Sequence, residues 1–424
     1  MVNALRSHPS TSKLHLLVAS SNSGSFTYDG IELGAERVTH EVEAALAQYA
    51  REGTSITKIS VVGYSLGGLV ARYFIGLLYS RGWFEDGKLT PMNFTTFATP
   101  HIGCRTPIIG YHSTVWNMLG ARTLSMSGRQ LFTIDLFRQT GRPLLAVLAD
   151  RGSIFMRALS RFQVRSLYAN IQNDRTAPFY TTGISRIDPY KNLPNLNLNY
   201  VPGYDNVILD STRPILPEAQ IGSGNKPSFL SAVKRSTISI ARRIPLALAF
   251  VLFVPIFTIV FLTSSIVQTF RSARRIRLHE QGKAGIGLGT YRLPLMVEDM
   301  HTAMEEAMGD LAPASADTRR KDGDGREYLP ASDTTSPKAA VKAANAELDE
   351  SKQTQTFPVL ALSKEQFEMI DSLDSDEVRF TKHFVHIHHV MHSHAAIIVR
   401  SPKKKAFREG KEVIRFWLEN EFML

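Results

Sequence analysis

The segment Gly63-Tyr64-Ser65-Leu66-Gly67 has the Gly-x-Ser-x-Gly pattern that holds a nucleophilic serine on a sharp turn. An apolar run, 59–62, predicts a buried strand before it, and apolar residues at helical spacing follow it. This order of strand, turn and helix is typical of a nucleophile elbow, in which strained backbone lifts the serine hydroxyl clear of the sheet. We expect Gly63 and Gly67 to occupy the crowded positions where strand and helix nearly touch.

A nucleophilic serine needs a histidine as general base and an acid that orients the histidine. Asp174 and His394 follow Ser65 in the order serine, acid, histidine that α/β-hydrolases use. Asp174 comes just after a predicted strand, 164–169, at the strand end where catalytic loops of open α/β sheets collect. An aspartate that only caps a turn is the alternative interpretation. Other acids lie in irregular sequence without a clear strand before them: Asp188, Asp205 and Asp210.

The choice of histidine is harder because six of them crowd together: His383, His386, His388, His389, His392 and His394. We favour His394 over His392, since His394 lies in the loop after a predicted strand, 384–390, between two small residues. His386 and His388 fall on one face of that strand, which is more typical of packing than of chemistry. No cysteine or carboxylate spacing nearby matches a known metal site. We therefore expect neither a metal nor a cofactor.

These residues predict a covalent mechanism. His394 takes the proton from Ser65 as Ser65 attacks an ester carbonyl, and Asp174 fixes the imidazole tautomer and stabilises the imidazolium. The backbone N–H of Leu66 is the expected oxyanion donor. Water then hydrolyses the acyl-serine intermediate.

The elements that must position these residues alternate between strands and helices. Predicted strands cover 14–19, 59–62, 94–98, 164–169, 384–390 and 395–400, and predicted helices include 34–51 and the segment after the elbow. This alternation implies an α/β fold with a mainly parallel sheet. The single cysteine, Cys104, excludes an internal disulfide and is typical of a reducing compartment, and 1–13 has no apolar signal-peptide core.

The net charge of +10 comes partly from basic residues that flank an uncharged apolar run, 244–270. This distribution favours an anionic membrane surface over nucleic acid as the partner. A single membrane crossing would place Asp174 and His394 on opposite sides of the bilayer. Pro245 and Pro255 divide the run into arms of about 12 residues, each able to cross roughly half a bilayer. We therefore expect a re-entrant hairpin or an in-plane anchor, with a buried core hairpin as the alternative.

The chain accordingly divides into five parts. The expected hydrolase core comprises 1–235 and 358–424, separated by a basic-flanked membrane anchor (236–280), a helical connection (281–309) and a disordered insertion (310–357). Thr335, Ser336 and Pro337 in that insertion fit a regulatory phosphosite, although such a composition is ordinary for a linker.

Several separate motifs resemble the family of fungal serine esterases, which are α/β-hydrolases that include a lipid-droplet phospholipase. The motifs are Gly63 to Gly68, Thr99-Pro100-His101-Ile102-Gly103, Tyr168-Ala169-Asn170 with Asp174, and Ser393-His394-Ala395. The resemblance covers roughly 15–200 and 380–424. It implies a serine hydrolase acting on acyl esters of lipids or phospholipids. The expected hairpin or in-plane anchor suits a lipid droplet or the cytosolic leaflet of the endoplasmic reticulum.

One part of the family pattern is missing. Such proteins begin with a strand that ends in His-Gly, whose loop supplies a second oxyanion donor, and this sequence contains no His-Gly pair. Loss of one such donor typically costs about a hundredfold to a thousandfold in rate. We expect an N-terminally shortened form that lacks the first strands, with recruitment of 20–25 as the alternative. The second functional interpretation is a catalytically impaired relative that only binds lipid surfaces.

Overall fold

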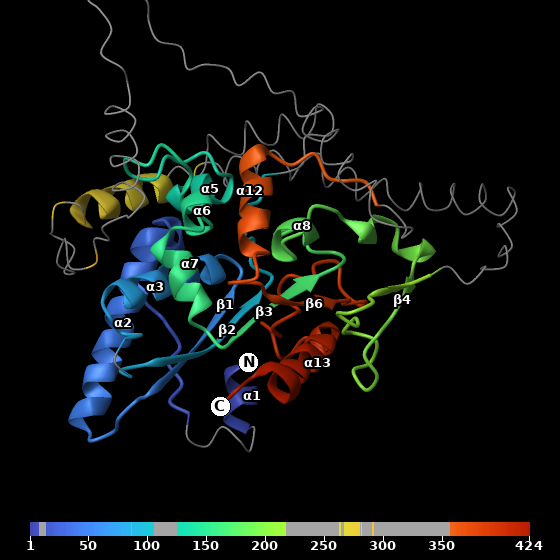
Figure 1. Ribbon diagram of the computed structural model, residues 1–424, viewed down its shortest axis with the longest axis horizontal. Coiled ribbons are helices and arrows are strands. Elements are labelled where there is room, and N and C mark those ends of the chain that lie inside the picture. The colour runs from blue at the N-terminus through green and yellow to red at the C-terminus, as the bar shows by residue number, and fades with distance from the viewer. Residues whose placement is uncertain are drawn as a thin grey trace, which may run out of the picture.

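The computed structural model describes residues 1–7, 14–85, 87–105, 125–217, 263, 267–279, 281, 291 and 357–424. Within these residues, four parallel strands form the central sheet in the order β1-β2-β3-β6 (Figure 1). The strands are β1 (Lys58–Tyr64), β2 (Thr90–Phe97), β3 (Val164–Asn170) and β6 (Thr381–Val385). This sheet with its flanking helices confirms the predicted mainly parallel α/β fold.

Helices pack against both faces of the sheet (Figure 1). One face carries α2 (Ile31–Arg51), α3 (Leu66–Ser80), α6 (Leu144–Leu148), α7 (Ile154–Ser160) and α12 (Lys364–Leu373). The other face carries α1 (Val2–Ser7), α13 (Glu409–Phe416) and the π-helical turn Trp417–Glu421. Smaller elements are η2 (Gly24–Tyr28), α5 (Met126–Leu131), α8 (Phe179–Thr182), η3 (Pro189–Asn195), η4 (Lys405–Phe407), and an antiparallel pair, β4 (Asn197–Leu198) with β5 (Ile215–Leu216).

The central strands are buried although they contain several hydroxyl side chains. Thr95 on β2 and Ser166 on β3 are both buried, and their hydroxyl oxygens lie 3.1 Å apart in a hydrogen bond. The indole N–H of Trp417 donates to the Thr95 hydroxyl over 3.2 Å, which ties the C-terminal helical segment to the sheet. These pairings satisfy polar groups that would otherwise destabilise the interior.

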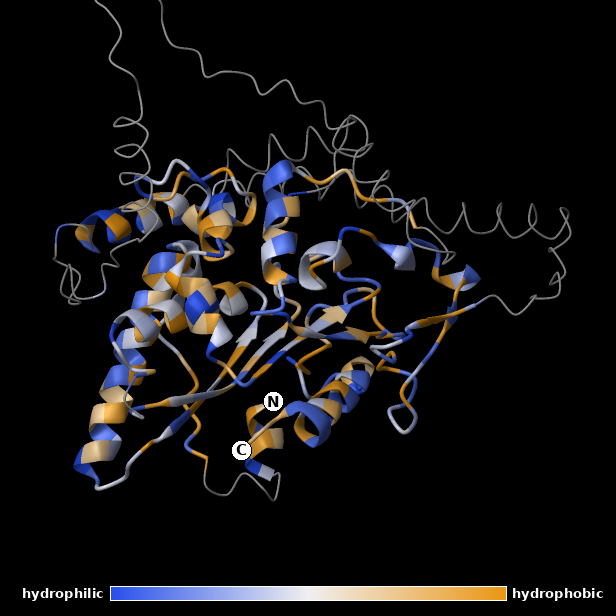
Figure 2. Ribbon diagram, in the orientation of Figure 1, coloured by the Kyte–Doolittle hydropathy of each residue, from blue (hydrophilic) through white to orange (hydrophobic). Residues whose placement is uncertain are grey.

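The helix that follows the elbow is buried around most of its circumference. Helix α3 packs against β1, α2 and α7, and a Cβ added at Gly76 would lie only 2.4 Å from the Phe155 ring of α7. By contrast, α2 is buried mainly in its first turns, 31–39, and peripheral helices carry hydrophobic and hydrophilic residues side by side (Figure 2). Because α3 is held on several sides, the turn that begins it has little freedom to move.

Two predicted strands are absent. Residues 14–20 form no strand, and Leu17 and Val18 are 44% and 59% exposed. Residues 395–400 form consecutive turns, in which the N–H of Ala396 and of Ile397 donates to the carbonyl of Ser393. In the second segment the apolar side chains are buried without strand pairing, and a short apolar run alone does not distinguish the two cases.

The predicted insertions lie mostly outside the described residues. Pro245, Pro255 and 310–356 belong to this undescribed part, as do the expected phosphosite and most of 281–309. Of the expected anchor, 263 and 267–279 are described, and 267–279 is helical. No helix among the described residues combines the length and the apolar character needed to cross a bilayer.

Candidate active site

Ser65 occupies the turn between β1 and α3, as the elbow pattern predicts. Its backbone has φ 53° and ψ −130°, a conformation that residues other than glycine rarely adopt. The Ser65 N–H donates to the carbonyl of Phe97 on β2 over 2.9 Å, and the Gly68 N–H donates back to the Ser65 carbonyl over 3.0 Å. These bonds hold the strained residue at the carboxyl end of its strand.

Close packing around the elbow depends on Gly63 and Gly68. A Cβ added at Gly63 would lie 2.4 Å from the Cα of Gly68, and one added at Gly68 would lie 2.0 Å from the Thr99 hydroxyl oxygen. A Cβ at Gly67 would meet no atom within 4 Å. The crowding that we expected at Gly67 therefore lies at Gly68, because that residue faces the loop after β2.

The structure brings Ser65, His394 and Asp174 together. The His394 Nε2 lies 2.8 Å from the Ser65 Oγ, and the His394 Nδ1 lies 2.9 Å from the Asp174 Oδ2. The side chains of His394 and Asp174 are 12% and 2% exposed. The three groups come from chain segments separated by 109 and 220 residues (65 to 174, and 174 to 394), yet each distance is that of a hydrogen bond. This is the geometry of a serine, general base and orienting acid.

Asp174 receives further hydrogen bonds that fix its carboxylate. The side-chain amide of Asn170, the last residue of β3, donates to the Asp174 Oδ2 over 3.0 Å. The backbone N–H groups of Thr176 and Ala177 donate to Oδ1 over 3.1 Å and 2.8 Å. The carboxylate thus caps a turn and also reaches His394, so turn capping is not its only contact.

The His394 loop is anchored from both sides. The Ser393 hydroxyl donates to the carbonyl of Gln172 over 2.6 Å, and the Ser393 N–H donates to the carbonyl of Asn173 over 3.1 Å. The Tyr64 hydroxyl donates to the His394 carbonyl over 3.1 Å. Burial raises the pKa of Tyr64, which keeps this hydroxyl neutral and able to donate.

The neighbouring histidines make other contacts. His392 is exposed. The His386 Nδ1 lies 2.7 Å from the Tyr200 hydroxyl, and the His388 Nδ1 lies 2.8 Å from a Glu409 carboxylate oxygen. His383 is buried and stacks on Tyr168, with ring centroids 4.8 Å apart. Within the described part of the chain, no group of three or more histidine, cysteine or acidic residues is arranged to hold a metal ion.

The competing acids lie in local turns. Asp188 accepts from the N–H of Tyr190 over 3.2 Å, and burial raises its pKa. Asp205 lies in a turn at φ 46°, and Asp210 accepts from the backbone and hydroxyl of Thr212. Among the described residues, the carboxylate that contacts His394 is that of Asp174.

The expected oxyanion donor is placed at the start of α3. Leu66 is the first residue of that helix, so its N–H has no acceptor within the helix and adjoins Ser65. In the alternative loop, 20–25, the N–H groups of Ser20 and Ser21 instead donate to the carboxylate of Glu41 over 3.0 Å and 3.2 Å. Two amides of that loop are therefore already engaged.

Sequence reasoning missed the support beneath the elbow. Arg72 of α3 is fully buried, and its guanidinium donates to the carbonyls of Leu148 (2.9 Å) and His101 (3.3 Å). Burial lowers the pKa of Arg72 to about 9 and lowers that of His101 well below its usual range. The His101 Nε2 lies 3.0 Å from the Thr96 hydroxyl. The Thr99 to Gly103 motif thus joins α3 to the end of β2.

Comparisons with known proteins agree with this geometry. Residues 2–187 match the family described as "Putative serine esterase". The chain is 33% identical over 165 residues to "Putative lipase ROG1" of Saccharomyces cerevisiae, covering 38% of this chain and 23% of that protein. It is 35% identical over 130 residues to "Putative lipase C4A8.10" of Schizosaccharomyces pombe, covering 30% and 16%.

A third relative, "Putative lipase YDL109C" of Saccharomyces cerevisiae, is 32% identical over 134 residues, covering 32% of this chain and 20% of that protein. The matched segments thus span less than a quarter of the length of each of these relatives. No solved structure shows significant similarity to this chain. With its elbow, its parallel sheet and these matches, the chain carries, over residues 2–187, a domain of the family described as "Putative serine esterase".

Proposed function

We propose that this chain is a serine hydrolase of the lipase or phospholipase type, which cleaves acyl esters of lipids at a membrane or lipid-droplet surface. The observation that carries the proposal is the continuous hydrogen-bonded line from the Ser65 Oγ through the His394 imidazole to the Asp174 carboxylate, at 2.8 Å and 2.9 Å. The match of residues 2–187 to the family described as "Putative serine esterase" supports the same chemistry.

Each group in this line has a defined role in acyl transfer. The Ser65 Oγ attacks the ester carbonyl carbon while the His394 Nε2 takes its proton, and Asp174 stabilises the resulting imidazolium. The Leu66 N–H donates to the carbonyl oxygen as negative charge develops on it. His394 then gives the proton to the leaving alcohol, which leaves an acyl group on Ser65. Water attacks this acyl-serine with His394 again as base, and the fatty acid is released.

The proposed location is the cytosolic face of the endoplasmic reticulum or the surface of a lipid droplet. It is supported by the uncharged stretch 244–270 with basic residues on both sides. Lipid esters are the substrates available at such a surface.

A fluorophosphonate probe tests the chemistry directly, because it phosphonylates only an activated serine. The full chain on phospholipid vesicles should be labelled, and the Ser65→Ala variant should not. The labelled protein should also release fatty acid from the vesicles. A folded wild-type protein that stays unlabelled would overturn the hydrolase proposal and favour a relative that only binds lipid.

A further inference from the structure

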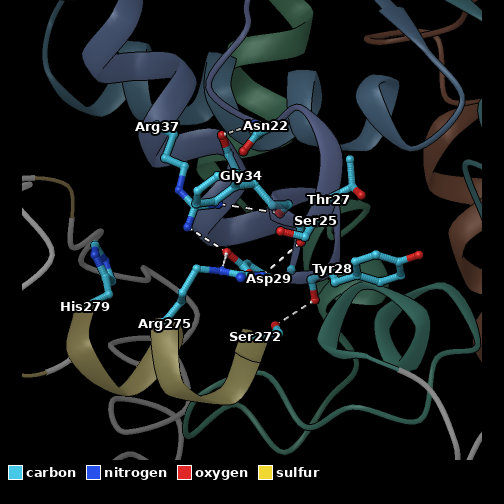
Figure 3. A network of polar contacts seen from close by, with 12 residues as sticks. Asn22, Ser25, Thr27, Tyr28, Asp29, Gly34, Arg37, Ser272, Arg275 and His279 are labelled. Carbon is cyan, nitrogen blue, oxygen red and sulfur yellow. Dashed lines mark hydrogen bonds and ion pairs between the residues drawn. The ribbon is translucent and has the colours of Figure 1, made fainter. Parts of the chain in front are cut away.

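A buried carboxylate joins the 267–279 helix to the catalytic domain. Asp29, between η2 and α2, has a side chain with 0% exposure and lies between two guanidinium groups. Arg275 donates to it from Nε at 3.0 Å and 2.8 Å and from Nη2 at 2.6 Å, and Arg37 donates from Nη2 at 2.7 Å (Figure 3). Both guanidinium groups also lie over the Phe26 ring, at 4.7 Å and 5.0 Å from its centroid.

Two further contacts fix the same face of this helix. The Ser272 hydroxyl donates to the carbonyl of Tyr28 over 3.1 Å, and the His279 Nε2 lies 2.6 Å from a Glu36 carboxylate oxygen. Ser272, Arg275 and His279 are spaced by three and four residues, so they lie on one side of the helix and point toward the catalytic domain (Figure 3). The helix is therefore docked in one orientation.

The opposite side of the helix is exposed and has a distinct character. Val267 and Phe270 are 47% and 73% exposed, and the side chains of Arg271, Arg274 and Arg277 are also exposed. These five residues follow a spacing of three, one, three and three, which forms one stripe of a helix. The stripe is apolar at its N-terminal end and cationic at its C-terminal end. The helix carries both hydrophobic and hydrophilic residues (Figure 2). Among the described residues, no carboxylate pairs with the three arginines.

The docked helix lies at the same end of the molecule as Ser65. Helices α2 and α3 run parallel, because Gly34 approaches Val70 (3.4 Å for an added Cβ) while Glu43 bonds Arg81 farther along both helices at 2.6 Å. Helix α3 begins directly after Ser65, so the start of α2 lies beside the elbow. Asp29 lies two residues before the first residue of α2, and the 267–279 helix therefore docks at that end.

We propose that the exposed stripe of the 267–279 helix binds an anionic phospholipid surface, and that the Asp29–Arg275 contact holds the end bearing Ser65 toward that surface. Three arginines beside exposed Val267 and Phe270 suit such an interface, where apolar side chains enter the acyl boundary and cations meet phosphate. The stripe also begins within the uncharged stretch 244–270, to which Val267 and Phe270 belong. This proposal rests on the proposed function, since it assumes that the substrate lies in that surface.

Removal of positive charge tests whether the stripe binds an anionic phospholipid surface. For Arg271→Gln/Arg274→Gln, we expect binding to vesicles of phosphatidylcholine with phosphatidylserine to weaken about 30-fold, since each basic residue near an anionic surface contributes about fivefold. Binding to pure phosphatidylcholine should not change. The control, Lys403→Gln/Lys404→Gln, removes two exposed lysines elsewhere and should bind like the wild type. An unchanged affinity for the first variant, or an equal loss in the control, would overturn the proposal.

A spin label tests the orientation. Since Cys104 is the single cysteine, Phe270→Cys in a Cys104→Ala background carries one nitroxide. On anionic vesicles, its oxygen accessibility should rise and its accessibility to a water-soluble nickel complex should fall. A label at Glu52→Cys, at the far end of α2, should stay water-accessible. A label at 270 that remains as aqueous as the one at 52 would refute the orientation.

The Asp29–Arg275 contact, here called the clamp, needs a variant of its own. Asp29 is buried, and its loss risks unfolding. Arg275→Gln keeps Asp29 paired with Arg37 and should leave the fold intact, while the label at 270 loses its membrane protection. Fluorophosphonate labelling in vesicle-free solution separates this proposal from the hydrolase proposal. Labelling of Ser65 should persist in every stripe and clamp variant. If the wild type is not labelled but the stripe still binds anionic vesicles, the hydrolase assignment fails and the surface assignment stands.

Discussion

The geometry of the elbow predicts that alanine has different effects at Gly63 and at Gly67, the two glycines of the Gly-x-Ser-x-Gly motif. In Gly63→Ala, the new Cβ would lie 2.4 Å from the Cα and 2.8 Å from the N of Gly68, and 3.1 Å from the Gly67 carbonyl oxygen. All three are backbone atoms of the turn and of α3, which cannot move aside as a flexible side chain can. In Gly67→Ala, the Cβ would meet no atom within 4 Å.

The two substitutions should therefore change stability in opposite directions. Overpacking typically costs about 1–3 kcal/mol, and we expect Gly63→Ala to reach about 3 kcal/mol because the clash is with backbone. That loss corresponds to a melting temperature lower by roughly 6–12 °C for a domain of this size. Gly67→Ala lies inside α3, where alanine is favoured over glycine by up to about 1 kcal/mol. It should be neutral or slightly stabilising.

The effect on chemistry should follow the same division. A shift of about 1 Å at Ser65 costs on the order of a hundredfold in rate, so Gly63→Ala should react with a fluorophosphonate about a hundredfold more slowly. Urea unfolding followed by tryptophan fluorescence gives the stability, and labelling rates give the reactivity. If Gly63→Ala is as stable and as reactive as Gly67→Ala, the close approach at the elbow is wrong.

Three further predictions follow from the site and its surroundings. Asp174→Asn should lower kcat about ten-thousandfold while the protein stays folded, because His394 loses the partner that sets its tautomer; an active variant would remove Asp174 from the mechanism. Burial, with the charge of His388, lowers the pKa of His386 to about 4, whereas the unfolded value is about 6.5. Between these two pH values the unfolded chain binds more protons than the folded chain, so the free energy of unfolding should fall as pH drops from about 6.5 to 4. In His386→Gln the free energy of unfolding should fall less steeply over the same range. Equal slopes in the two proteins would contradict this. Burial, with the charge of Asp174, raises the pKa of Cys104 to about 12, so iodoacetamide at pH 8 should modify it about a thousandfold more slowly than an ordinary thiol; modification at the ordinary rate would show that the thiol is accessible and ionised.

The sequence predicted the parts of the fold that local pattern controls. Apolar runs with flanking turn residues identified 59–62 and 164–169, which fall within strands of the sheet, and 94–98, which lies within β2 except for Ala98. The same reasoning failed for 14–19, where Leu17 and Val18 are exposed, and for 395–400, where apolar residues are buried without strand pairing. It failed in part for 384–390, since β6 ends at Val385. Whether such a run pairs as a strand depends on a neighbour in the sheet, and the pattern does not contain the neighbour.

At the site, sequence identified the residue types and their order, because a nucleophile elbow requires small residues around a serine within a few positions. It favoured His394 over His392, and the structure places His394 against Ser65 while His392 is exposed. It also gave no sign of the crowding at Gly68, which results from Thr99 in the loop after β2.

Only the tertiary structure revealed the contact between Asp29 and Arg275, which are 246 residues apart. In the sequence, Arg275 is one of four arginines after an apolar run, and all four appear equivalent. Packing distinguishes them, since Arg275 faces a buried carboxylate while Arg271, Arg274 and Arg277 face solvent. Local sequence determines which residues can share a helix face, and the fold determines what that face meets.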